Sequence, residues 1–420
     1  MQLVRSWLGA VLCATLLAAP ASAQSTTAPD IGVLRSIETQ VEQIRGLQPL
    51  AEPDLRLLDQ AALHDYLADQ FQQDYLPGER ESDQKELVAL GLIKPTDDLV
   101  QMQLDLLSAQ VVGVYDSESK LMFLLADQGP HAFGPAARMT YAHEFNHALQ
   151  DQHFDLNKIA PKHPDSNDHS LAVHAVIEGD AVMLQTLWAQ ANLTPDDLMQ
   201  VARGDGSSGD SLARVPLVVR TELLFPYVDG YAFVRQAYRQ AGSYSGVDDL
   251  LRNPPESTAQ ILHPDKYLNQ VHPVAISLPG LAAELGPDWR QVGSGVLGEL
   301  DTRTLLEQWG TSHSDAVRVA SGWSGDQWQL AEKDGRSAIV LKSTWASPAA
   351  ASDFFSAYAR GLRYRFDSAT LEESSASRQA LTTPVAATDL RLEGSDVLAV
   401  IAFDRDTANA IVAAVSASAL

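Results

Sequence analysis

Two histidines and a glutamate lie within five consecutive positions, in the run His143-Glu144-Phe145-Asn146-His147. Residues four positions apart on an α-helix share one face, so the imidazoles of His143 and His147 can reach the same metal ion. Glu144 is rotated by about 100° from His143, which places its carboxylate where it can take a proton from water beside that ion. The pattern predicts a catalytic centre with one Zn²⁺ ion and with Glu144 as the base.

A catalytic zinc ion needs a third protein ligand and an open position for water. His153 follows His147 at the spacing of the third histidine in the pattern HExxHxxGxxH, but Gln150 stands where that pattern needs a glycine. If the helix continues, His153 points about 240° away from His147 and cannot reach the same ion.

Glu178 is the competing third ligand, and it lies in the next predicted helix, His169–Ala191. Its face also carries Leu171, His174, Ala175, Ala181 and Val182. That face is expected to be buried, and a buried carboxylate requires a partner such as zinc. We therefore favour Glu178 over His153.

Other residues near these positions could support the ligands. His174, one turn before Glu178, is either a further ligand or a hydrogen-bonded core histidine. Asp151 and Asp180 could orient the imidazoles, or serve ordinary capping and surface roles.

Peptide hydrolysis through a tetrahedral oxyanion also requires a hydrogen-bond donor opposite the base. Tyr227, Tyr231 and His263 are the candidates, and His263 lies in the turn-rich run NPPESTAQILHPDKY. We rank Tyr231 and His263 together as the catalytic donors to test.

Several elements must position this site. Helical spacing between residues 31 and 107, broken by four prolines, predicts three or four short helices. Val111–Leu125 has the pattern of a β-hairpin, and the motif helix is expected over Ala136–Gln152. Zinc peptidases commonly hold an extended substrate against an edge strand, so the hairpin serves either that role or the core.

The rest of the chain predicts a second unit. A glycine- and serine-rich break at 204–211 precedes helical spacing over Leu212–Tyr238, and the catalytic unit is expected to end near residue 288. Beyond it, two strands in 327–345, a helix at 349–361, a hairpin at 390–403 and a helix at 407–417 predict a small separate α+β domain over 289–420. Its role is not indicated.

The first residues have the pattern of a cleaved signal peptide, residues 1–23: Arg5, an apolar run and Ala21-Ser22-Ala23. The apolar run is shorter than the roughly 20 residues that span a bilayer, so we expect export to the periplasm or medium without stable membrane insertion. Cys13, the only cysteine, lies inside this segment, which excludes disulfides and cysteine ligands after cleavage. The net charge of -24 argues against nucleic-acid partners.

The stretch AHEFNHALQDQHFDL, with VIEGDA downstream, resembles a group of bacterial gluzincin-type HExxH zinc metallopeptidases, mostly uncharacterised and distantly similar to thermolysin. The runs GVYDSESKLMFL and PPESTAQILHPDKY also fit, so the resemblance covers about residues 33–285. It implies His143, His147 and Glu178 as zinc ligands, Glu144 as the base, and a mainly helical zincin-like domain over residues 24–288. One departure is Val182, where thermolysin-like enzymes place an aspartate.

These observations predict an α+β protein that acts as an exported zinc metallopeptidase on a peptide or protein substrate. The alternative is a non-catalytic envelope protein that binds zinc or a partner. A fourth protein ligand, either His153 or His174, would favour that alternative. The sequence does not indicate an oligomeric state.

Overall fold

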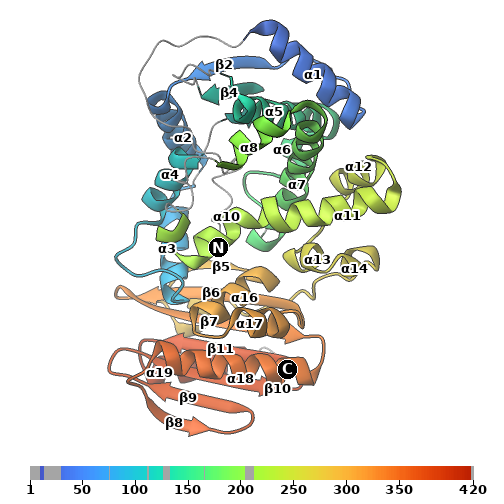
Figure 1. Ribbon diagram of the computed structural model, residues 1–420. Coiled ribbons are helices and arrows are strands. Elements are labelled where there is room, and N and C mark those ends of the chain that lie inside the picture. Colours follow the sequence, from blue (N-terminus) through green and yellow to red (C-terminus); the bar gives the residue numbers. More distant parts are fainter. Residues whose placement is uncertain are drawn as a thin grey trace.

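The computed structural model describes residues 10–13, 30–74, 76–110, 113–125, 133–164, 166–203 and 212–417. They form an α+β fold, as expected, with a helical part around a four-stranded sheet and a second part around a seven-stranded sheet (Figure 1). Most of the predicted signal segment and the break at 204–211 lie outside the described residues.

Four helices precede the hairpin, in agreement with the proline-bounded spacing: α1 (Ile31–Arg45), α2 (Gln60–Asp74), α3 (Glu79–Ala89) and α4 (Leu99–Gln110). The side chain of Asp30 caps α1 by accepting a hydrogen bond from the Gly32 amide. The strand β2 (Asp54–Leu58) was not predicted. It pairs in parallel with a strand far along the chain, and local spacing does not reveal such a partner.

The small sheet has the order β1-β3-β4-β2 and lies against the motif helix. The predicted hairpin is present as β3 (Gly113–Asp116) and β4 (Leu121–Leu125). On the outer side of β3, the backbone of β1 (Ala10–Cys13) pairs with it antiparallel. Because β1 lies inside the predicted signal segment, cleavage after Ala23 would remove it and leave β3 at the edge.

Two long helices carry the motif residues. The first, α5 (Pro135–Phe154), begins with a proline and ends at Asp155, whose φ is 60°. The second, α7 (Asn167–Asn192), is capped by Ser166, which accepts a hydrogen bond from the amide of His169. The two helices pack together in a buried apolar core. In the sequence, α6 (Leu156–Ile159) lies between them and α8 (Pro195–Arg203) follows α7.

The helical spacing over 212–238 resolves into α10 (Leu217–Phe225), a π-helical turn η2 (Pro226–Gly230) and α11 (Tyr231–Ala241). The turn packs closely on α7: a Cβ added to Gly179 would lie 2.4 Å from the Gly230 carbonyl oxygen. This glycine contact brings the backbone of Tyr231 beside Glu178. The helices that follow are α12 (Ser245–Arg252), α13 (Thr258–Leu262), α14 (Pro264–Leu268) and α15 (Leu281–Leu285).

The second part is an antiparallel sheet with the order β5-β6-β7-β11-β10-β9-β8. Its strands are β5 (Arg290–Gly295), β6 (Trp323–Lys333), β7 (Arg336–Trp345), β8 (Thr370–Ser374), β9 (Arg378–Thr382), β10 (Ala387–Glu393) and β11 (Asp396–Ala402). The two predicted strand pairs are present, but β5, β8 and β9 were missed. Every residue of β8 is exposed, so no apolar alternation marks it.

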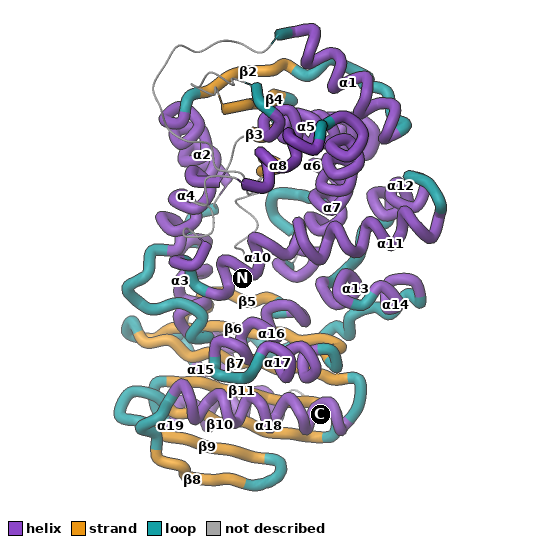
Figure 2. The backbone as a smooth tube through the Cα atoms, in the orientation of Figure 1, coloured by secondary structure: helices purple, strands orange, loops and turns teal. Residues whose placement is uncertain are grey.

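Helices cover both faces of this sheet: α16 (Gly298–Gln308), α17 (His313–Ala320) and α18 (Pro348–Arg365) lie on one side, and α15 and α19 (Arg405–Ala417) on the other. Strands β5 and β7 pack against α3. At the end of α16, the Trp309 indole N–H donates to the Leu90 carbonyl, at the end of α3, at 3.2 Å. One apolar core thus runs from α2–α4 into the sheet. Figure 2 shows the seven-stranded sheet and its helices in the lower part of the molecule, and the small sheet with β2 and β4 among the helices of the upper part. Within the described chain, every helix is too short or too polar to span a bilayer.

Candidate metal centre

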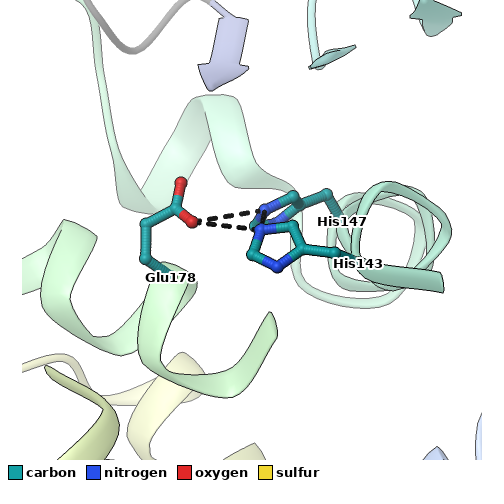
Figure 3. Close-up of side chains that lie close together, drawn as sticks. All are labelled: His143, His147 and Glu178. Atoms are coloured by element: carbon teal, nitrogen blue, oxygen red, sulfur yellow. Dashed lines mark hydrogen bonds and ion pairs between the residues drawn. The ribbon is translucent and has the colours of Figure 1, made fainter. Parts of the chain in front are cut away.

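Helices α5 and α7 bring the three predicted ligands together (Figure 3). The Nε2 atoms of His143 and His147 lie 2.9 Å apart. The Oε2 atom of Glu178 lies 3.2 Å from the first and 3.5 Å from the second. All three side chains are buried, and their facing atoms lie within 4.8 Å of one another, so the group could hold a metal ion.

The hydrogen bonds of the outer ring nitrogens support this assignment. His147 Nδ1 lies 2.7 Å from Gln150 Oε1, and His143 Nδ1 lies 3.3 Å from Gln185 Oε1. An amide oxygen only accepts, so each Nδ1 carries a proton, and in the neutral form of each imidazole the Nε2 lone pair points inward. Two lone pairs and a carboxylate oxygen then converge on one point. Such a set of acceptors could hold a metal ion.

The electrostatics favour an ionised carboxylate here. Burial opposes ionisation of Glu178, but attraction to His147 and hydrogen bonds with both imidazoles lower the pKa of Glu178 to about 2. Burial also lowers the pKa of His143. For His147, attraction to Glu178 and Glu144 outweighs burial and raises the pKa. Glu144 is thus one of the charges that raise the pKa of His147.

Glu144 is enclosed between α5 and the first residue of β3. A Cβ added to Gly113 would lie 3.1 Å from Cγ of Glu144 and 2.7 Å from Cγ2 of Thr140. Only glycine therefore allows the strand to approach Glu144 this closely. The hairpin and Glu144 form one local unit.

Among the described residues, the converging group contains neither His153 nor His174. His153 Nε2 hydrogen-bonds with the Gln48 carbonyl at 2.8 Å, and His174 Nδ1 with the Ser170 carbonyl at 2.6 Å. His174 is thus the hydrogen-bonded core histidine considered above. Asp151 does not orient an imidazole: its carboxylate accepts from the Tyr115 hydroxyl at 2.8 Å and from Lys120 at 2.6 Å.

The predicted oxyanion donors occupy different places. His263 Nε2 lies 2.6 Å from Glu299 Oε1, at the contact with the C-terminal sheet. Tyr231 begins α11, beside the helix turn that carries Glu178, and its ring lies 5.8 Å from the Arg235 guanidinium. The role of both residues as donors stays a prediction.

The sequence interpretation missed the residues behind the ligands. Gln150 was considered only as the missing glycine, although its position three residues after His147 places both on one helix face. Gln185 and Arg45 carried no local signal. Arg45 lies 135 positions before the aspartate that it contacts.

A second buried polar group lies where α7 and α10 meet α16 and β6; we call Asp168, Glu222, Asp301 and Asp326 the acid junction. The Asn167 amide lies between Glu222 and Asp301, 3.4 and 3.5 Å from their oxygens. Burial raises the pKa of Asp168 to about 7 and that of Asp326 to about 6. Burial and mutual repulsion also raise the pKa of Glu222 and of Asp301. These carboxyls therefore lose their protons at higher pH than ordinary surface carboxyls do.

Comparison with known proteins identifies part of the chain. Residues 286–412 match a family described as a domain of unknown function, DUF8575, which covers the seven-stranded sheet and most of its helices. Neither curated proteins nor solved structures give a match.

Proposed function

We propose that this protein is an exported zinc-dependent peptidase in which Glu144 activates water for hydrolysis of a peptide bond. The observation that carries the proposal is the convergence of His143 Nε2, His147 Nε2 and Glu178 Oε2 on one point, with Glu144 one residue from the first ligand. A zincin-like fold for the helical part belongs to the same proposal.

In this proposal, one set of residues binds the metal ion and another residue transfers the proton. His143, His147 and Glu178 would hold the zinc ion, which would supply Lewis-acid chemistry. Glu144 would take the proton from the attacking water and later pass it to the leaving amine. Tyr231 and His263 remain the candidates to donate to the oxyanion.

The number of ligands supports catalysis over a structural metal. His153 and His174, either of which could complete a four-ligand site, lie outside the converging group of described residues. Three protein ligands leave a position for water, whereas structural zinc sites are closed by four.

The neighbouring strand supports a peptide as substrate. β3 already pairs with an added strand, because Ala10–Cys13 lies antiparallel to Gly113–Asp116. An extended peptide could take that place through main-chain hydrogen bonds, and Gly113 lies against the side chain of Glu144. The scissile bond of such a peptide would pass close to the base.

The decisive experiment compares wild-type protein, Glu144→Gln and the control Glu393→Gln on a peptide library with zinc supplied. Glu393 is an exposed residue of β10, so its substitution should change nothing. Glu144→Gln should retain zinc but lose about 100-fold or more in kcat, the usual scale for a general base. Equal hydrolysis by all three proteins would disprove the mechanism.

The second candidate is a non-catalytic zinc-binding protein. It is favoured by burial, because His143 and His147 are 0% exposed and Glu178 is 2% exposed. Stoichiometric zinc in the wild-type protein without cleavage of any library peptide would select this alternative.

A further inference from the structure

Behind His147, a chain of buried polar contacts runs away from the ligand group. Gln150 Nε2 donates to the Ile177 carbonyl at 2.9 Å and to Asp180 Oδ2 at 2.8 Å. Two acceptors on one side fix the orientation of the amide, so its oxygen must face His147. Gln150 therefore determines which nitrogen of His147 carries the proton.

Asp180 is itself held in place from α1 and α12. Arg45 Nε lies 3.2 Å from Asp180 Oδ2, and Arg45 Nη1 lies 2.7 Å from Asp248 Oδ1. The guanidinium also lies 4.5 Å from the centre of the Tyr244 ring. Both Arg45 and Asp180 are buried, so the ion pair is shielded from screening by solvent. The Gln150 amide is consequently anchored to three helices besides its own.

The other imidazole has a weaker support. Gln185 Oε1 lies 3.3 Å from His143 Nδ1, compared with 2.7 Å for Gln150 and His147. Gln185 is 7% exposed, whereas Gln150 is 0% exposed. This asymmetry offers a matched control within one site.

We propose that Gln150 is a positioning residue for metal binding, and that Asp180 and Arg45 serve to fix its amide. The network holds His147 with Nδ1 protonated and Nε2 aimed at Glu178. This inference rests on the proposed metal site and assigns residues that the HExxH pattern does not contain. It also links α1, at the start of the described helices, to the metal ligands.

Zinc affinity, measured by competition with a chromophoric chelator, tests the network. Gln150→Leu should weaken zinc binding about 10- to 100-fold, the usual cost of losing a partner of a ligand histidine. Gln185→Leu should weaken it less, because its contact is longer. Thermal unfolding without zinc checks that each variant is folded.

A coupled pair of substitutions separates positioning from packing. Gln150→Glu alone should bind zinc poorly, because its carboxylate would face Asp180. Adding Asp180→Asn supplies a donor in place of that charge, and the double variant should regain about tenfold in affinity. Packing alone would not produce this recovery.

The outcomes distinguish this inference from the proposed function. Tight zinc binding by the wild type and by folded Gln150→Leu alike would overturn the positioning role and leave the metal site standing. A wild-type protein that binds no zinc would overturn both. Weak binding by Gln150→Leu with recovery in the double variant would support the network, whatever the hydrolysis assay gives.

Discussion

The ligand group (His143, His147 and Glu178) and the acid junction are both buried sets of polar side chains, but the pKa values of their carboxyl groups shift in opposite directions. At the ligand group, two imidazoles and one carboxylate aim their acceptors at a common point, and Glu178 stays ionised. At the acid junction, several carboxyl groups lie near one another, and burial raises their pKa, so that they lose their protons at higher pH than usual. The difference shows that burial alone does not define a metal site; the donor atoms must also converge on one point.

Removing a ligand should have the largest effect. Glu178→Ala should reduce zinc affinity by more than about 100-fold, because the only ligand carboxylate is lost and losing an outer partner alone costs up to that much. Isothermal titration with zinc gives the measurement. Glu222→Gln, at the acid junction, is the control and should bind zinc as the wild type does; a similar loss there would erase the distinction between the two groups.

The acid junction should respond to pH instead. The pKa of Asp168 in the folded protein is about 7, above its ordinary value of 3.8, so the folded state binds the extra proton. Stability from this group is complete below about pH 4 and is lost as pH rises through about 7. Asp168→Asn should therefore raise the free energy of unfolding at pH 8 by roughly 2–4 kcal/mol.

Denaturant titrations at pH 4 and pH 8 measure the free energy of unfolding of Asp168→Asn and of the wild type. The amide oxygen can still accept from the Thr258 amide, as Asp168 does at 3.1 Å. The variant should match the wild type at pH 4 and exceed it at pH 8. An equal difference at both values would mean that Asp168 does not carry the proton.

Gly113→Ala tests the contact between the hairpin and the base. A Cβ here would lie 2.7 Å from Thr140 Cγ2, and overpacking of this kind typically costs about 1–3 kcal/mol. Because Glu144 is displaced too, kcat should fall by more than the stability loss alone implies. Gly280→Ala is the control, since its added Cβ would lie 3.8 Å from Ala283. Full activity of folded Gly113→Ala would separate β3 from the site.

The smallest effect is expected at His153. His153→Ala removes a hydrogen bond to the Gln48 carbonyl, worth about 1 kcal/mol at most at this exposed position, and no proposed metal ligand. Zinc affinity should be unchanged. A clear loss of affinity would restore His153 as a ligand and overturn the choice of Glu178.

Sequence alone determined the core of the ligand group. His143 and His147 are four residues apart, and Glu178 lies on an apolar helix face. Both patterns follow helical periodicity, which can be read from residues close together in the sequence. The same reasoning placed the hairpin before the motif helix. It also favoured Glu178 over His153, because an uninterrupted helix turns the His153 side chain away.

Only the tertiary structure decided what surrounds these residues. Arg45 meets Asp180, and Asp168 meets Thr258, across long separations in the chain. Strand β2 is parallel to β4, and the exposed strand β8 lacks an apolar pattern. Such contacts depend on how helices and strands pack, and packing brings together residues whose local sequences carry no sign of one another. The three residues of the ligand group can therefore be predicted from the sequence, whereas the side chains that orient them cannot.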